Sequence, residues 1–296
     1  MSFAIAMDGL RYRAGRSFEI RDLHLRVPRG AIYGFLGPNG SGKTTTIRLV
    51  LGLLRPLGGK ITVLDHEVPR DIVPILARTG YVPEQPHLDA TLTVAETVRF
   101  HAAFYPTWDQ AWADRLLRDF ELDPARLFGR LSKGQKGKLM MLLALAQRPE
   151  LLVLDEPTDG LDPVVRRDML TALLDYVAQQ GATVFVSSHL VHELERICDW
   201  VAVMDRGALV SELPMQRFKD GIKRLRVSGA PAQPAGLPFR LLARTPNGTT
   251  ESWVVSGWSP EMTSYFDAGS TALREVIDLD LEEGFVELLR AARQPA

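Results

Sequence analysis

The chain of 296 residues predicts an α/β fold with a mainly parallel sheet covered by helices, followed by a smaller α+β domain. Three apolar runs have the length and composition of buried strands: Leu151–Asp155, Thr183–Ser188 and Trp200–Asp205. An amphipathic stretch between the first two predicts a helix, with Asp162 as its N-cap and Pro163 at its first position. Strands that alternate with helices in this way indicate a parallel sheet with both faces covered.

The region before these strands predicts further elements. Residues 1–36 alternate short apolar runs with glycine and charged residues, which indicates a small antiparallel sheet whose last strand is 31–36. The segment TTTIRLVLGLL (44–54) then predicts a helix, and GYV (80–82) a short strand. Between residues 91 and 147 the apolar residues recur at three-to-four spacing, so we expect a helical region.

The character of the sequence changes after about residue 212. The segments IKRLRV, FRLLAR and ESWVVSG resemble strands and are separated by turns rich in proline and glycine. The closing segment LEEGFVELLRAA predicts a helix, and one face of that helix carries Leu281, Phe285, Leu288 and Leu289. We therefore expect two domains, 1–214 and 215–296.

Composition limits the cellular environments and the classes of binding partner that we expect. A net charge of -1 gives no electrostatic reason to expect nucleic acid as a partner. The single cysteine, Cys198, cannot form an internal disulfide, which favours a reducing cytoplasm. No segment reaches the ~18–20 apolar residues needed to cross a bilayer, and residues 1–9 lack the pattern of a signal peptide. If the protein acts at a membrane, we therefore expect it to do so through another chain.

The strongest local motif is a glycine-rich loop. Residues 37–44, GPNGSGKT, fit G-x-x-x-x-G-K-[ST] between a predicted strand and a predicted helix. Backbone N–H groups of such a loop surround phosphates, Lys43 adds a full positive charge, and the Thr44 hydroxyl suits Mg²⁺. The residues expected to bind the nucleotide here are Gly37, Pro38, Asn39, Gly40, Ser41, Gly42, Lys43, Thr44 and Thr45.

Two carboxylates follow the first buried strand. Asp155 and Glu156 stand at its end, where buried charges are costly unless they serve a metal or a partner. Phosphoryl transfer needs one acidic group to hold Mg²⁺ and another group to polarise the attacking water. Asp155 suits the metal, and Glu156 suits the water.

A third motif, LSKGQ (131–135), places Ser132 before a glycine-bearing turn that opens a helix. Such a turn presents N–H donors to an anion, although a serine cap of this kind is common by itself. Its position after the phosphate loop and before the acidic strand end closely resembles the ATP-binding-cassette (ABC) ATPase family. The resemblance covers about residues 3–215.

The resemblance implies a fold and further roles. The fold is a phosphate-loop NTPase cassette with a RecA-like parallel core, an N-terminal antiparallel β subdomain and a helical signature subdomain at about 87–148. By likeness to the family, Tyr12 stacks on adenine and His189 contacts the γ-phosphate. The loop TDGLD (158–162), which includes Asp162, crosses between protomers.

Two positions depart from the family pattern. Where the family has glutamine after the strand GYVP, this chain has Glu84 followed by Gln85, so either residue is a candidate γ-phosphate sensor. The signature carries Lys133 where glycine is commonest. That lysine, the C-terminal extension and the segment FYP (104–106) are similar to bacterial exporters of drugs, antibiotics and lipids.

The family mechanism places ATP between two cassettes that face head to tail. One chain supplies catalytic Lys43, Glu156 and His189, together with the Mg²⁺ ligands Thr44, Asp155 and Glu84. The second copy, or a paralogue, supplies the signature residues Ser132, Gly134 and Gln135.

The expected function is therefore that of an ATPase subunit which hydrolyses ATP to drive transport, in the direction of export, through a separate membrane permease. It would lie in the cytoplasm, peripherally on the inner face of the cell membrane. Candidate contacts with the permease are His87, Leu88, Phe104 and Tyr105.

Two alternatives remain open at this point. One is a soluble ABC ATPase without a transporter, for which an iron–sulfur assembly role is the hardest to exclude. A DNA-repair role would need a long coiled coil before the signature, and a translation role typically needs two cassettes in one chain. The other alternative is a regulatory subunit that binds ATP without hydrolysing it, which the intact Asp155, Glu156 and His189 disfavour.

Overall fold

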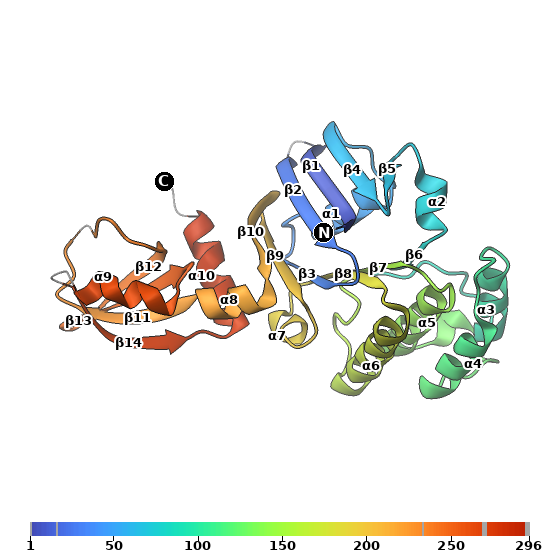
Figure 1. Ribbon diagram of the computed structural model, residues 1–296. Helices are drawn as coiled ribbons and strands as arrows, with labels where there is room; N and C mark the ends of the chain where they lie inside the picture. Colours follow the sequence, from blue (N-terminus) through green and yellow to red (C-terminus); the bar gives the residue numbers. More distant parts are fainter. Residues whose placement is uncertain (1, 16, 233, 268–270, 294–296) are drawn as a thin grey trace.

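A computed structural model describes residues 2–15, 17–232, 234–267 and 271–293, and its strands form three sheets within those ranges (Figure 1). The first sheet is antiparallel and has the strand order β2-β1-β4-β5. Its strands are β1 (Phe3–Ala14), β2 (Phe18–Pro28), β4 (Gly58–Val63) and β5 (His66–Val68).

The second sheet is the core of the molecule, and it confirms the predicted α/β class. Its order is β10-β9-β3-β8-β7-β6, with every pair parallel except β10 and β9. The strands are β3 (Ile32–Leu36), β6 (Thr79–Val82), β7 (Leu151–Asp155), β8 (Thr183–Ser188), β9 (Trp200–Asp205) and β10 (Ala208–Pro214).

The prediction for residues 31–36 was wrong in one respect. The strand β3 exists, but it lies between β8 and β9 in the core sheet and does not close the antiparallel sheet. All five residues of β3 are buried, as suits a strand with helices or sheet on both faces. The antiparallel sheet is instead completed by β4 and β5, which the sequence analysis missed.

The helices begin where the sequence provides caps. Asp162 accepts hydrogen bonds from the N–H groups of Val164 and Val165 and so caps α6 (Pro163–Gln180), as predicted. Ser132 and Gln135 form a reciprocal capping box at the start of α5 (Lys133–Ala146). The remaining helices of the first 214 residues are α1 (Lys43–Val50), α2 (Ile72–Leu76), α3 (Val94–Ala102), α4 (Gln110–Asp119) and α7 (Val191–Leu194).

Helix α1 is shorter than the predicted 44–54. The carbonyl of Arg48 accepts hydrogen bonds from the N–H groups of both Leu53 and Leu54, at 2.8 and 3.2 Å, which turns the chain out of the helix. Across the ranges that the structure describes, every helix is too short or too polar to span a bilayer.

The C-terminal part contains the third sheet, with the order β12-β13-β11-β14. One face of this sheet packs on an aromatic core that includes Trp253, Phe239 and Phe266. The other face is covered by α10, on which the predicted residues Leu281, Phe285, Leu288 and Leu289 are all buried. The elements are α8 (Met215–Gly221), β11 (Lys223–Ser228), β12 (Arg240–Asn247), β13 (Thr250–Ser256), α9 (Ser264–Asp267), β14 (Ala272–Asp278) and α10 (Leu281–Arg293).

The C-terminal part joins the core sheet without a linker. Strand β10 ends at Pro214 and α8 begins at the next residue. Helix α10 packs against α7, β9 and β10, so its apolar face belongs to the same buried cluster as theirs (Figure 1). Arg293 at the end of α10 donates two hydrogen bonds of 2.8 Å to the carboxylate of Asp205, and these hold the pKa of Asp205 below its usual value.

A tight turn between β9 and β10 ties the two main sheets together. Its two central residues, Arg206 and Gly207, both have positive φ (48° and 79°), as a two-residue hairpin turn requires. The Gly207 N–H donates to the carbonyl of Ser41 at 2.8 Å, and the Gly207 carbonyl accepts from the N–H of Arg21 at 3.3 Å. The turn therefore links the glycine-rich loop, through Ser41, to strand β2, through Arg21.

This position predicts a strong requirement for glycine. A Cβ on Gly207 would lie 1.8 Å from the carbonyl oxygen of Glu19, so Gly207→Ala forces the turn away from β2. We expect Gly207→Ala to destabilise the protein by about 3 kcal/mol, as the sum of a left-handed alanine and a backbone clash. Calorimetric thermal unfolding measures this loss.

The matched control is Gly181→Ala. Gly181 ends α6 with a similar φ of 64°, but a Cβ there has no described atom within 4 Å. Only the cost of the left-handed conformation, roughly 1 kcal/mol, should appear. Equal losses of unfolding temperature in the two variants would contradict this account of the turn.

Candidate active site

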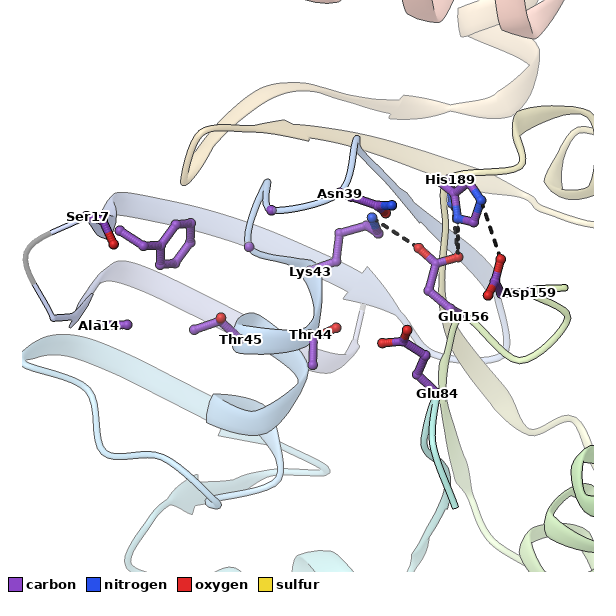
Figure 2. A pocket seen from close by; sticks show the side chains of 13 residues that line it. Ala14, Ser17, Asn39, Lys43, Thr44, Thr45, Glu84, Glu156, Asp159 and His189 are labelled. Carbon is purple, nitrogen blue, oxygen red and sulfur yellow. Dashed lines mark hydrogen bonds and ion pairs between the residues drawn. The ribbon is translucent and has the colours of Figure 1, made fainter. Parts of the chain in front are cut away.

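The site lies where three neighbouring parallel strands end. Leu36 of β3 pairs with Ser188 of β8, and Asp155 of β7 pairs with Ser187, so their carboxyl ends meet at one edge of the core sheet. A cavity of about 680 Å³ opens there (Figure 2). Its lining residues are Ala14, Ser17, Phe18, Asn39, Gly40, Gly42, Lys43, Thr44, Thr45, Glu84, Glu156, Asp159 and His189.

The glycine-rich loop forms one wall of the cavity. Gly42 has a φ of 116°, and a Cβ there would lie 2.6 Å from the ring of Phe18, so the loop closes tightly only with glycine. The next residue, Lys43, is buried and donates a hydrogen bond of 2.7 Å to the carbonyl of Gly37. The loop thus holds an ammonium group at the N-terminus of α1, where the helix dipole also favours an anion.

Asp155 lies beside Thr44, which lines the cavity. Its Oδ1 atom accepts hydrogen bonds from the hydroxyls of Ser187 (2.7 Å) and Thr44 (3.1 Å). Burial raises the pKa of Asp155, and the two hydrogen bonds oppose that rise. Figure 2 shows the carboxylate of Glu84 pointing towards Thr44. Hydroxyl and carboxylate oxygens are the ligands that Mg²⁺ prefers, so this group of three side chains fits the ion.

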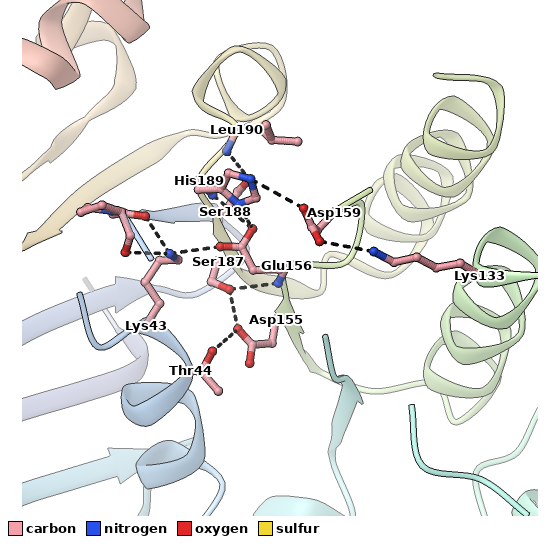
Figure 3. Close-up of polar contacts among 12 residues, drawn as sticks. Lys43, Thr44, Lys133, Asp155, Glu156, Asp159, Ser187, Ser188, His189 and Leu190 are labelled. Atoms are coloured by element: carbon pink, nitrogen blue, oxygen red, sulfur yellow. Dashed lines mark hydrogen bonds and ion pairs between the residues drawn. The ribbon is translucent and has the colours of Figure 1, made fainter. Parts of the chain in front are cut away.

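Glu156 adopts an unusual backbone conformation. Its φ of 47° lies in the left-handed region, which a residue with a side chain occupies at a cost of about 1–2 kcal/mol. The backbone N–H of Glu156 is held in place by the hydroxyl and the carbonyl of Ser187, at 3.1 and 3.2 Å. The turn directs the carboxylate off the strand and into the cavity (Figure 3).

The carboxylate of Glu156 contacts both His189 and Lys43. Its Oε2 atom accepts a hydrogen bond from the backbone N–H of His189 at 3.1 Å and lies 2.8 Å from the ring atom Nδ1. Its Oε1 atom faces the Lys43 ammonium at 3.1 Å, in an ion pair that lacks the alignment of a hydrogen bond. The cavity therefore combines a cation for a phosphate with a carboxylate and an imidazole that could polarise a water.

Other residues predicted for the nucleotide lie away from this cavity wall. The signature residues Ser132, Gly134 and Gln135 stand at the start of α5, where Ser132 and Gln135 cap the helix. Asp162 is engaged as the cap of α6. Tyr12 lies on β1 opposite Ile20 and packs against the core of the antiparallel sheet.

The two candidate sensors, Glu84 and Gln85, border two neighbouring cavities. Glu84 lines the cavity and a second cleft of about 480 Å³ beside it, whereas Gln85 lines that second cleft. Tyr81 borders the same cleft, where burial, reinforced by the charge of Asp155, raises its pKa to about 12 and keeps the phenol neutral.

Among the residues of the site that sequence reasoning missed, three have an identifiable role. Phe18 supplies an aromatic wall next to the loop, Ser187 positions both acidic residues, and Asp159 lines the cavity next to His189. The position of Ser187, one residue before the end of a buried strand, was a usable signal. Phe18 reaches the site only through the three-dimensional fold, whereas Asp159 lies in the loop TDGLD, which was expected to cross between protomers.

Comparisons with known proteins agree with this geometry. The family model described as ABC transporter matches residues 20–159. The bacitracin transport ATP-binding protein of Bacillus licheniformis is 36% identical over 74% of this chain and 72% of its own length. The Nod factor export ATP-binding protein I of Bradyrhizobium diazoefficiens is 36% identical over 71% of this chain and 70% of its own.

A solved structure of the ATP-binding subunit of an ABC transporter matches with a TM-score of 0.66 and 28% identity, over 74% of this chain and 92% of that chain. It shares the fold that surrounds the cavity. On the strength of the matched relatives, the chain belongs to the ABC transporter family, as an ATP-binding subunit with ATPase activity.

Proposed function

We propose that this chain hydrolyses ATP with Mg²⁺ between two head-to-tail cassettes and thereby drives export through a separate membrane permease. The observation that carries the proposal is the cavity lined by Lys43, Glu156 and His189, with Asp155 hydrogen-bonded to Thr44 of the same lining. We assign the cassette to residues 1–214, with its helical subdomain at about 87–148, and an accessory domain to 215–296.

Lys43 and the glycine-rich loop bind the phosphates. In the structure the ammonium group is held by the loop carbonyl of Gly37 and by Glu156. An incoming triphosphate offers stronger, charge-assisted acceptors to the same donors. Thr44, Asp155 and Glu84 would hold Mg²⁺, which neutralises charge on the β- and γ-phosphates when it is bound. We prefer Glu84 to Gln85 as sensor because Glu84 lines the phosphate cavity.

Glu156 orients and deprotonates the attacking water, and His189 holds the γ-phosphate. The left-handed turn at Glu156 and the contact with His189 fix the carboxylate before substrate arrives, so little reorganisation is needed. Phe18 and Ala14 flank the cavity next to the loop, which makes this wall a second candidate, beside Tyr12, for the adenine contact.

The second cassette completes the site. Ser132, Gly134 and Gln135 lie outside their own chain's cavity lining, which supports a role for them at the nucleotide of a partner. The N–H groups at the start of α5 then face the γ-phosphate, and the loop with Asp162 crosses between the chains. ATP joins the two copies, and its hydrolysis releases them.

The permease would dock beside the second cleft. Leu53, His87 and Leu88 line this cleft. Phe100 of α3 and Phe104, which follows that helix, are 56% and 64% exposed. Their rings form an edge-to-face pair with centroids 5.0 Å apart. Exposed aromatic pairs of this kind mark protein interfaces. The relatives named for bacitracin transport and Nod factor export support a peripheral location on the inner face of a membrane.

The phosphate loop can be tested through its lysine. Lys43→Met should weaken ATP binding about 10–100-fold, because charge-assisted contacts to phosphate contribute roughly 1.5–3 kcal/mol. A fluorescent ATP analogue measures the affinity. Lys60→Met removes an exposed lysine of β4 and should leave the affinity unchanged. ATP affinity retained by Lys43→Met would contradict the assignment.

The catalytic role of Glu156 has a matched control at the other end of β7. Glu156→Gln should retain ATP binding, lose turnover by about 10²–10⁴-fold, and accumulate an ATP-bound dimer on size-exclusion chromatography. Glu150→Gln changes the carboxylate before β7, which pairs with Arg78 at 2.6 Å, and should keep full turnover. Hydrolysis by Glu156→Gln at near the wild-type rate would remove Glu156 from this role.

The docking surface is tested by Phe104→Ser. Loss of this exposed ring should weaken binding to membranes that contain the permease by about tenfold, the effect of one interface anchor. Val276→Ser on β14, which is 40% exposed in the C-terminal part, serves as the control. Unchanged copurification with the permease in the Phe104→Ser variant would place the interface elsewhere.

A further inference from the structure

The signature lysine contacts a loop of its own chain. The Nζ atom of Lys133 lies 3.3 Å from Oδ2 of Asp159. The same amine sits so close to Gly160 that a Cβ there would be 2.6 Å from it. Lys133, at the first position of α5, therefore lies across the loop 158–162 (Figure 3).

Asp159 connects this lysine to the catalytic group. Its other oxygen, Oδ1, lies 3.6 Å from Nε2 of His189. His189 contacts Glu156 through Nδ1 at 2.8 Å, and Glu156 faces Lys43 at 3.1 Å. A continuous series of opposite charges and polar contacts thus runs from the signature turn to the phosphate loop within one chain (Figure 3).

The charges that line the cavity explain why a cation beside Asp159 is needed. Three carboxylates line the cavity, those of Glu84, Glu156 and Asp159, although its expected ligand is a polyanion. Lys43 faces Glu156, and Glu84 is a proposed metal ligand, which leaves Asp159 as a negative charge beside His189. Lys133 supplies the cation that offsets Asp159 and fixes the direction of its carboxylate.

We propose that Lys133 is a positioning residue that couples the two ATP sites of the cassette dimer through Asp159 and His189. The proposal rests on the proposed head-to-tail function. In that dimer the signature turn of one chain contacts the partner's ATP, whereas His189 contacts the chain's own ATP. Lys133 joins the two, so ATP engagement at one site stabilises the position of His189 at the other.

The exposure of the ion pair predicts which measurements respond. The side chains of Lys133 and Asp159 are 60% and 37% exposed in the single chain. An ion pair with this exposure contributes little to the stability of one chain. It gains strength when dimer closure removes the surrounding water. Its loss should therefore change cooperative ATP hydrolysis while leaving the unfolding temperature of the chain unchanged.

The test is a double-mutant cycle in the full chain assembled with its membrane subunit. Lys133→Met should raise KM for ATP about fivefold or more and lower the Hill coefficient of hydrolysis towards one, whereas Lys133→Arg should retain wild-type behaviour. In an Asp159→Asn background, Lys133→Met should have no further effect. Lys136→Met is the control, because Lys136 lies on the same helix but over the ring of Phe128.

Two results would overturn the proposal. One is a change of KM and Hill coefficient on Lys133→Met that persists at full size in the Asp159→Asn background. The other is an equal effect of Lys136→Met, which would indicate a general contribution of positive charge on α5. A wild-type complex without ATP hydrolysis would instead overturn the proposed function itself, so the two failures are distinguishable.

Discussion

The parallel pairing of β3, β8 and β7 is the constraint on which the site depends. Because these strands run in one direction and in register, the segments that follow them reach the same edge of the sheet. The glycine-rich loop, Glu156 and His189 are far apart in the chain, yet they border one cavity. The turn at Gly207, which donates to Ser41, keeps the loop at that edge.

The site concentrates features that are unfavourable for stability. Lys43 and Glu156 are charged and buried, and removing two charges from water costs more than an exposed ion pair returns. Burial raises the pKa of Asp155, and Glu156 adopts a left-handed backbone. These costs are consistent with a cavity arranged for a phosphate and a metal ion, because both ligands would satisfy the charges that now face one another.

Local patterns predicted much of this molecule. The cap at Asp162, the glycine-rich loop, the buried strands of the core and the apolar face of α10 are all encoded within a few neighbouring residues. What failed was pairing over long distances. Strand β3 was assigned to the wrong sheet, since its apolar run does not specify its neighbours. Strand β5 has three residues, and β14 has no fully buried residue, so neither gave a recognisable signal.

The same distinction applies to the site. Lys43, Thr44, Asp155 and Glu156 belong to contiguous motifs and could be named from the sequence. Phe18 has no motif of its own and borders the cavity because a strand pair folds back over it. Asp159 belongs to the loop TDGLD, which was assigned to the contact between protomers and not to the cavity. Tyr12, chosen by likeness, packs against the core of its sheet, and its contact with adenine stays a prediction.

The junction at Pro214 determines what a shortened chain would look like. Helices α8 and α10 press apolar side chains, among them Phe218 and Leu288, onto α7 and β9 with no spacer between the two parts. Truncating the chain after β10 would expose the apolar surface of α7 and β9 to water, and exposed apolar surfaces of this kind drive self-association. A protein truncated after Pro214 would therefore aggregate through this exposed apolar surface, even if its ATP site were intact.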